Sequence, residues 1–373
     1  MSGAVHDAIV VGAGMVGSAI AYGLARAGQH VCMLDQDDVA FRASRGNFGL
    51  VWIQAKGAGY HRYAEWSRRS GQLWPALAQD LAAETGIDVE LEQPGGFFFS
   101  FTDEELSQRE QVLRDIQGKV RGDYPFEMMD RSEIRARIPE IGPDVVGGSY
   151  TPMDGHVHPL KTLQALHAAC EKRSAPVHAG QSIRDVEYHE GVFTLHTQGA
   201  QWRARKLVLA AGLGNRELAA KVGIDAPVRP IRGQILVTER LRRFLNYPTN
   251  KVRQTGEGGV QLGDSVEDVG FNDLTSTETL ATIARRGTRT FPLLNDVKLV
   301  RAWAALRVMS PDGFPIYEES MRCPGAYLAT CHSGVTLCAA HAADVAGWIA
   351  GGARPENLDA FSPDRFAAGR AAP

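Results

Sequence analysis

The feature that most constrains the fold is a glycine-rich turn close to the start of the chain. The apolar run 8–12 predicts a buried strand, and Gly12, Gly14 and Gly17 follow at its end. Residues 14–27 then place apolar side chains at helical spacing, which predicts a helix. This order of strand, turn and helix indicates the first part of a parallel βαβ unit.

The second strand of that unit ends at an acid. Residues 30–34 predict the strand, and Asp35 follows it, 18 residues after Gly17. Such glycines allow a tight turn, a close approach of a pyrophosphate and close packing of helix on strand, while the helix N–H groups face the phosphates. An acid at this point binds ribose hydroxyls and repels a 2′-phosphate. The residues therefore predict a dinucleotide site and argue against NADP, but they do not separate FAD from NAD.

Three later segments favour FAD. The segment "ASRGNFG" (43–49) supplies small and hydroxyl residues just after the second strand. "LVLAAG" (207–212) is an apolar strand ending in small residues, and "HSGVTL" (332–337) is a glycine turn that could aim N–H groups at an anionic flavin ring. Segments so widely spaced along the chain are typical of a long cofactor bound in an extended form.

Composition and charge exclude several other classes. A net charge of −3 gives no reason to expect nucleic-acid binding, and no apolar run approaches the roughly 20 residues that span a bilayer. The N-terminus does not read as a signal peptide. Five cysteines without a CxxC pair predict reduced thiols in a cytoplasmic protein rather than disulfides, zinc or an iron–sulfur cluster. His156 and His158 lack a third ligand, so we expect no metal site.

Strands and helices are interleaved along the chain, which predicts a mixed α/β fold. We expect a Rossmann-type FAD-binding domain with an inserted substrate domain of mostly antiparallel sheet, and we expect residues 103–140 to be helical. The predicted FAD-binding domain comprises residues 1–86, 145–225 and 305–373, and the predicted substrate domain comprises residues 87–144 and 226–304.

These motifs, together with "DGHVHP", "PIRGQILVTE", "RAWAALRVMSPDGFPI" and "FSPDRF", occur in the order found in a known family. The chain resembles the D-amino-acid-oxidase-like FAD-dependent oxidoreductases, which include glycine oxidase, sarcosine oxidase and D-amino-acid dehydrogenase. The segments "ASRGNFGLVWIQAKG" and "HSGVTL" are most similar to the β (FAD) subunits of heteromeric D-hydroxyproline and opine dehydrogenases. The resemblance covers nearly the whole chain.

The resemblance implies a set of cofactor contacts. Asp35 would bind the adenosine ribose, the backbone of Ile183 would read the adenine edge, and Arg307 would grip the substrate carboxylate beside the flavin. No cysteine occurs in "ALRVMSPDGFPIYEE", where sarcosine oxidase tethers its flavin, so non-covalent FAD is expected. The full cofactor set is Gly12, Gly14, Met15, Val16, Gly17, Asp35, Gln36, Ser44, Arg45, Gly46, Asn47, Ile183, Ala211, Gly212, Arg307, Gly334, Val335, Thr336 and Leu337.

Three residues are candidates for substrate chemistry: Arg307, His332 and Gln54. Arg307 lies in an otherwise apolar strand, where a guanidinium needs a partner; that partner is a substrate carboxylate or an internal acid. His332 could touch substrate or flavin, or could be a satisfied core histidine. Gln54 and Trp52 follow the flavin-facing segment and could line the pocket, although packing explains Trp52 nearly as well.

Two departures from the family pattern bear on the reaction. Gln261 stands near the position of the lysine that activates oxygen in sarcosine oxidase, which weakens the reading as an oxidase. His158 replaces the acid of the family's "GHVDP", with no evident consequence.

The sequence therefore predicts an FAD-dependent dehydrogenase of D-hydroxyproline, an opine or a similar secondary amine. The resemblance implies that electrons leave through partner subunits, with FMN at a subunit interface and an iron–sulfur centre on a partner. Peripheral association with a membrane is compatible with this reading. One alternative is a stand-alone glycine, sarcosine or D-amino-acid oxidase that makes hydrogen peroxide. Another is an FAD-binding structural subunit of a larger complex.

Overall fold

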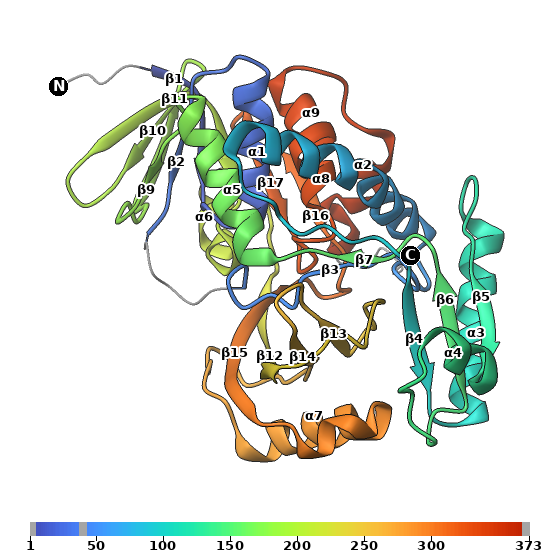
Figure 1. Ribbon diagram of the computed structural model, residues 1–373. Helices are drawn as coiled ribbons and strands as arrows, with labels where there is room; N and C mark the ends of the chain where they lie inside the picture. Colours follow the sequence, from blue (N-terminus) through green and yellow to red (C-terminus); the bar gives the residue numbers. More distant parts are fainter. Residues whose placement is uncertain (1–4, 37–42, 368–373) are drawn as a thin grey trace.

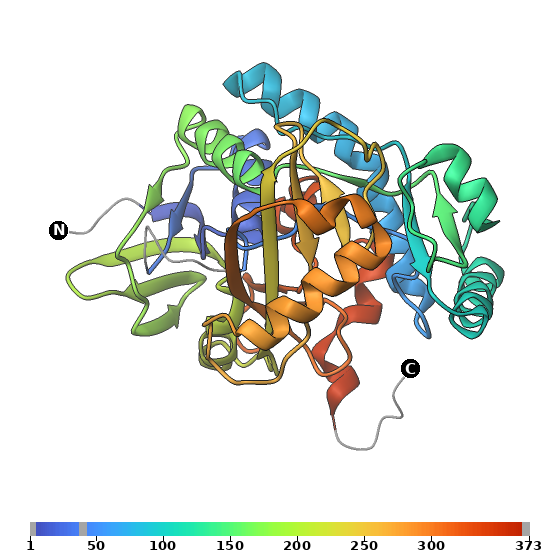
Figure 2. The same ribbon diagram turned by 60° about the horizontal axis from the view of Figure 1, so that its bottom comes forward.

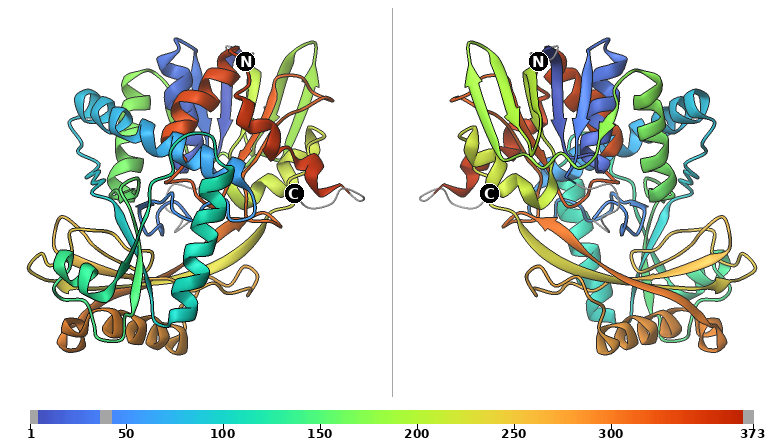
Figure 3. Two further views of the ribbon diagram at one scale, coloured as in Figure 1. Left: turned by 90° about the vertical axis from the view of Figure 1, so that its right-hand side faces the viewer. Right: turned by 90° about the vertical axis from the view of Figure 1, so that its left-hand side faces the viewer.

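The structure, a computed structural model, describes residues 5–36 and 43–367. A unit built on a large, mostly parallel sheet lies above a smaller antiparallel sheet, and a third small sheet with two helices lies to one side (Figure 1). The side views show long, curved strands running beneath the first unit (Figure 3). The chain is thus a mixed α/β protein, as expected.

The large sheet is the nucleotide-type sheet that the glycine turn predicts. Strand β1 (Val5–Val11) lies between β2 (Val31–Leu34) and β11 (Gln201–Leu209), and all three are parallel. The order continues outward to β8 (Val177–His178) on one side and to β17 (Ala326–Thr330) and β16 (Ile316–Glu319) on the other. The hairpin of β9 (Asp185–His189) and β10 (Val192–His196) pairs with β11.

Helices cover one face of this sheet. Helix α1 (Met15–Arg26) packs against α5 (Pro159–Lys172) and α9 (Ala346–Ala350), and α2 (His61–Thr85) packs on α5 and α8 (Cys338–Ala340). The chain after the loop 332–337 forms three helical pieces, because a π-turn, η3 (His341–Val345), separates α8 from α9. The opposite face packs on α6 (Asn215–Lys221) and the β9–β10 hairpin.

The residue at position 158 has a structural role at the start of α5. Pro159 is the first helical residue, and the Nδ1 atom of His158 accepts a hydrogen bond from the Lys161 backbone N–H at 3.3 Å. The imidazole therefore caps the helix, as the carboxylate of the family pattern could also do.

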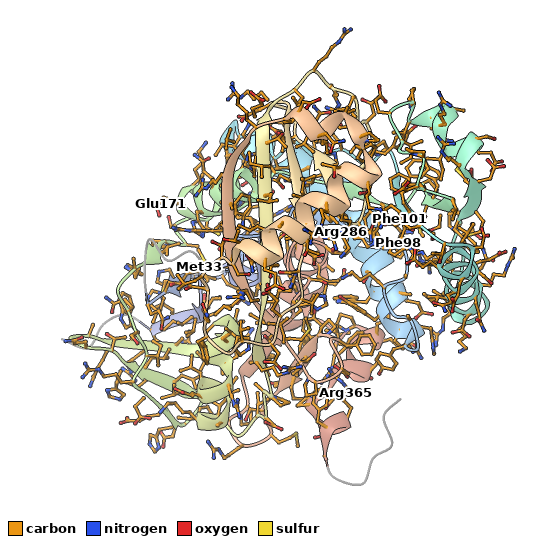
Figure 4. All side chains as sticks on the ribbon, turned by 90° about the horizontal axis from the view of Figure 1, so that it is seen from below. Met33, Phe98, Phe101, Glu171, Arg286 and Arg365 are labelled. Carbon is orange, nitrogen blue, oxygen red and sulfur yellow. The ribbon has the colours of Figure 1, made fainter. Side chains whose placement is uncertain are left out.

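The smaller antiparallel sheet has the order β13–β14–β12–β15. Its strands are β12 (Arg229–Arg240), β13 (Val252–Gln254), β14 (Gly259–Gly263) and β15 (Leu299–Met309). Helix α7 (Thr277–Thr290) covers its outer face (Figure 2). From that side Arg286 reaches the sheet (Figure 4), where its guanidinium donates to the carbonyl oxygens of Gly263 at 2.5 Å and Asp264 at 2.8 Å. The other face is turned toward the nucleotide-type unit.

The region 103–140 is not wholly helical, which corrects the sequence prediction. Helices α3 (Asp103–Lys119) and α4 (Arg131–Arg137) flank a strand, β5 (Glu127–Asp130). This strand joins β6 (Gly147–Thr151), which also pairs with β4 (Gly96–Ser100). A four-residue strand is stabilised by a partner distant in sequence, so local periodicity did not reveal it.

Candidate functional site

The glycine turn brings the ends of β1, α1 and β11 into close contact. Gly12 has φ +102°, and a Cβ atom there would lie 2.5 Å from the carbonyl oxygen of Ala210. A Cβ on Gly17 would collide with the carbonyl oxygen of Gly12. Both glycines are therefore required by backbone packing, as the sequence predicts.

Two distant segments meet at the first turn of α1. The Met15 N–H donates to Ser44 Oγ at 2.9 Å, and a Cβ on Gly334 would lie 3.4 Å from the Val16 side chain. The first turn of α1 carries no acidic residue, and its N-cap is Gly14. The positive end of this helix is therefore flanked by small and hydroxyl residues, which suits a phosphate group.

Asp35 is held at the carboxyl end of β2 beside the same turn. Its Oδ2 atom accepts a hydrogen bond from the Ala13 N–H at 2.7 Å, and the residue is 7% exposed. Its carbonyl oxygen accepts from Gln181 N–H at 2.8 Å, which brings the segment that leads to Ile183 to this end of the sheet. Gln36 is exposed. Asp35, the turn and this segment thus lie together where the sequence places the adenosine.

His167 is a neighbour of this turn that the sequence analysis missed. Its Nε2 atom lies 2.9 Å from both the Ala13 carbonyl oxygen and Ser18 Oγ. Burial lowers its pKa. The imidazole links α5 to the glycine turn, and a lone histidine inside a helical pattern gave no signal of this contact.

The segment that follows Ser44 and Arg45 is fastened on both sides. Asn47 Oδ1 accepts from the Gly49 N–H at 2.7 Å, and the indole N–H of Trp303 donates to the Gly46 carbonyl at 3.0 Å. Strand β3 (Leu50–Val51) then pairs with β7 (Gly155–His156). The predicted flavin-facing segment therefore lies between the glycine turn and the inner face of the β12–β15 sheet.

The loop 332–337 is attached to this segment from the other side. Thr336 Oγ1 donates to the Leu50 carbonyl and accepts from the Trp52 N–H, both at 3.2 Å. Trp74 donates from its indole to the carbonyl oxygens of Val335 and Thr336. Leu337 is buried, and Ala211 and Gly212 follow the end of β11. The expected cofactor segments thus surround one region of the molecule.

Arg307 lies on β15 with an internal carboxylate as its partner. Its guanidinium donates to Asp264 Oδ2 at 2.5 Å and to the Ser265 carbonyl at 2.8 Å. Asp264 also forms an ion pair with Lys251. These cations lower the pKa of the Asp264 carboxyl despite its burial. The Arg307 side chain is still 24% exposed, so a second carboxylate can approach it.

His332 and Lys56 lie close to Arg307. Burial, with the positive charges of Lys56 and Arg307, lowers the pKa of His332 to about 3, so its imidazole is neutral at physiological pH. Its Nε2 atom is 3.0 Å from Ser333 Oγ, which accepts a hydrogen bond from Lys56 Nζ at 2.6 Å. Burial lowers the pKa of Lys56 to about 8. The sequence analysis missed Lys56, although a cation within "WIQAKG" is a signal that could have found it.

Gln54 is buried in a polar cluster rather than facing open space. Its amide donates to Asp154 Oδ2 at 2.6 Å and to the Gly96 carbonyl at 3.0 Å, and its oxygen accepts from Arg109 and Ser149. Asp154 also accepts from the backbone N–H groups of residues 53 and 54. Protein groups thus occupy both donors and the acceptor of Gln54, which suits a role in holding the turn that carries Lys56.

A second cation approaches the flavin-facing segment from β13. Arg253 is 2% exposed, and its guanidinium donates to Gln261 Oε1 at 3.0 Å and to the Val157 carbonyl at 3.1 Å. A Cβ on Gly49 would lie 2.8 Å from this guanidinium. Gln261 itself is uncharged, but its cross-strand partner Arg253 places a buried positive charge in contact with the Gln261 amide.

Metal and disulfide chemistry find no support in the described part of the chain. No cluster of histidine, cysteine and acidic residues there could hold a metal ion. His156 Nδ1 instead lies 3.1 Å from the Arg253 guanidinium. All five cysteines are free. Within residues 5–36 and 43–367, no helix is both long and apolar enough to cross a membrane.

Comparison with known proteins decides the family. The family model described as "FAD dependent oxidoreductase" matches residues 7–348. The chain belongs to this family. An opine oxidase subunit of Agrobacterium tumefaciens (strain Ach5) is 43% identical over 366 residues, which cover 98% of this chain and 99% of that protein. The corresponding opine oxidase subunit of Rhizobium meliloti is 42% identical over the same shares.

Solved structures share the fold of this FAD-dependent oxidoreductase. The crystal structure of glycine oxidase from Geobacillus kaustophilus superposes with a TM-score of 0.88 at 23% identity, covering 96% of this chain and 98% of that one. The predictions of the family and of the FAD-binding fold are therefore confirmed.

The cofactor and the reaction class follow from the family. FAD is the cofactor and is bound non-covalently, and the protein is an FAD-dependent oxidoreductase. The residues present fit this cofactor, because the tight glycine turn and the acid-free first turn of α1 leave a helix end open to a pyrophosphate.

Proposed function

We propose that this chain is the FAD-carrying subunit of a heteromeric dehydrogenase that oxidises the secondary amine of an opine or a similar imino acid, such as D-hydroxyproline. The observation that carries the proposal is the meeting of Arg307, His332 and Lys56 next to the segments that fit FAD. The similarity to opine oxidase subunits over nearly the whole chain supports this substrate class.

The residues of the site suit the handling of an amino acid. Bound FAD supplies a two-electron acceptor for the hydride on the carbon next to the amine. Arg307 would bind the carboxylate on that carbon and so fix its position. The neutral His332 lies beside Arg307 and adds no positive charge next to the amine. We further propose that Ser44, Arg45 and Asn47 line the pyrophosphate and the flavin, with Asp35 on the ribose.

The route of the electrons is part of the proposal. Electrons would pass to a partner subunit that carries an iron–sulfur centre, with FMN at the interface between the subunits. The spacing of the five free cysteines does not suit cluster ligation by this chain. The similar proteins are named as subunits, which supports a multi-subunit enzyme.

The test is reduction of the bound flavin under anaerobic conditions, followed by admission of air. Octopine, nopaline, D-hydroxyproline, L-proline, sarcosine and glycine would be compared. Bleaching by one secondary amine with slow reoxidation supports the dehydrogenase. Rapid reoxidation with formation of hydrogen peroxide supports the stand-alone oxidase instead. If no candidate bleaches the flavin, even with the partner subunits added, the chain is an FAD-binding structural subunit.

A further inference from the structure

Lys56 carries a positive charge beside His332 to which the proposed oxidation assigns no role. It follows Ala55, which adopts a left-handed backbone (φ 61°), and it precedes Gly57, which has φ 77°. The Tyr124 hydroxyl accepts a hydrogen bond from the Ala55 N–H at 3.0 Å and donates to the Ile53 carbonyl at 3.0 Å. The turn is thus held in a fixed conformation that directs Lys56 toward Ser333.

The ammonium group of Lys56 forms no ion pair with any carboxylate of the described residues. Its hydrogen-bond partner is the neutral hydroxyl of Ser333 at 2.6 Å, and Nζ lies 5.6 Å from the centre of the Tyr63 ring. Asp154 attracts it electrostatically but is engaged by Gln54 and two backbone N–H groups. A partly buried cation without a counter-ion is costly, so such a group commonly has an anionic ligand.

Among Arg307, Lys251, Lys56 and Asp264, two positive charges are left uncompensated. Arg307 and Lys251 share the single carboxylate of Asp264, which leaves one positive charge in excess. Lys56 contributes a second. Arg307 comes from the antiparallel sheet and Lys56 from the turn after β3, and both charges act on His332. A ligand beside His332 therefore meets a cation from each unit.

We propose that Lys56 binds a second carboxylate of the substrate, so that the site selects a secondary amine that joins two carboxylate-bearing carbons. Arg307 holds the carboxylate next to the oxidised carbon, and Lys56 holds the carboxylate on the other side of the nitrogen. Lys56 is thereby a specificity-determining residue that favours dicarboxylates over amino acids with one carboxylate. This inference rests on the proposed function, because the proposed function makes the substrate a secondary amine and has Arg307 bind its first carboxylate.

The test uses two thioethers, which lack an amine and so cannot form an imine. Thiodiacetate carries two carboxylates, and (methylthio)acetate carries one. Each is titrated into the FAD-loaded full chain, and the dissociation constant is measured from the perturbed flavin absorbance and by calorimetry. The variants are Lys56→Met, which removes the charge, and Lys56→Arg, which keeps it. Lys119→Met, on the exposed surface of α3, removes a lysine that is paired with Asp115 and is the matched control.

The wild-type chain and the Lys119→Met variant are expected to bind thiodiacetate more tightly than (methylthio)acetate. Lys56→Met should weaken thiodiacetate binding by about 10- to 100-fold, the typical effect of one charge-assisted hydrogen bond, and leave (methylthio)acetate within about twofold. Lys56→Arg should retain much of the preference for thiodiacetate. FAD content and the melting temperature verify that each variant is folded.

Three results would overturn the proposal: no preference for thiodiacetate in the wild-type chain, an equal loss of both ligands in Lys56→Met, or no loss of either. An equal loss would mean that Lys56 only supports the loop of Ser333. The wild-type comparison stands even if a variant does not fold. The thioether titration measures binding without turnover, whereas the proposed oxidation is tested by flavin reduction. A negative result for the oxidation can therefore be told apart from a negative result for Lys56.

Discussion

The guanidinium of Arg307 lies directly against the backbone of Gly233, on the neighbouring strand β12. A Cβ atom at position 233 would occupy the space of that guanidinium. The glycine in "PIRGQ" therefore keeps a place open for the Arg307 side chain and its ion pair with Asp264.

Replacing that glycine should damage the substrate site without removing the cofactor. In Gly233→Ala the new methyl group displaces the Arg307 guanidinium, so amine substrates should reduce the flavin with a strongly raised apparent dissociation constant. Gly259→Ala is the matched control, because a Cβ there meets its nearest neighbour at an ordinary 3.6 Å. Anaerobic flavin reduction and FAD content measure the two effects. If an amine substrate reduced the flavin equally well in the wild type and in Gly233→Ala, Arg307 would have no role in substrate binding.

Removal of the Arg307 guanidinium should be more severe. Arg307→Ala is expected to lose about 2–5 kcal/mol of substrate binding and to keep its FAD. Arg307→Lys keeps the charge but not the two-pronged geometry, so it should recover only part of the affinity. The measurement is the concentration dependence of flavin reduction by each variant. If substrates reduced the flavin of Arg307→Ala as they reduce that of the wild type, the role of Arg307 would be limited to its ion pair with Asp264.

The carboxylate of Asp35 should matter for retention of the cofactor. Asp35→Ala removes the acceptor for the Ala13 N–H and the negative charge beside the glycine turn. The variant should lose FAD on dialysis, whereas Asp35→Asn, which keeps an oxygen acceptor, should lose less. Asp115→Asn on exposed α3 is the control. The flavin-to-protein ratio after dialysis gives the answer, and a wild-type ratio in Asp35→Ala would contradict the assignment.

Buried histidines should make the fold sensitive to acid. Burial lowers the pKa values of His156, His332 and His341 to about 3, whereas an unfolded histidine titrates near 6.5. Between these values the unfolded state binds three more protons, so stability falls as the pH falls. Burial raises the pKa of Asp154 to about 7, and this group acts in the opposite direction because its folded form holds a proton.

For these four groups the net difference is two protons, which corresponds to roughly 3 kcal/mol of unfolding free energy per pH unit between about pH 6 and pH 4. Denaturant unfolding at several pH values measures this slope. His341→Gln should reduce it by about one proton, and His189→Gln, at an exposed position, is the matched control. A flat stability profile from pH 7 to pH 5 would contradict the burial of these neutral imidazoles.

Much of the nucleotide-type unit could be predicted because its signals are local. The strand, the glycine turn, the helix and Asp35 lie within one stretch of sequence, and the structure places them as expected. The apolar strand around Arg307 was also identified from its own pattern. Whether its partner is a substrate or an internal acid was left open, and the structure shows Asp264, 43 residues away, as one partner.

The remaining features depend on contacts that no local pattern records. Strand β5 exists through its pairing with β6, and the π-turn that begins at His341 separates α8 from α9. Lys56 gains its place through Ser333, 277 residues later in the chain. Gln54 reads as a pocket residue from its position, yet Arg109 and Asp154 enclose it. These residues acquire their roles only through contacts between segments that are separated in the sequence.

The proposed reaction is the oxidation, by this chain, of a secondary amine held by Arg307 beside FAD. The most direct measurement is the loss of the long-wavelength flavin absorbance when octopine or nopaline is added to the FAD-loaded chain without oxygen. We expect bleaching by an opine, slow recovery in air, and loss of the bleaching in Arg307→Ala. An unchanged flavin spectrum with every amino and imino acid tested, in the presence of the partner subunits, would contradict it.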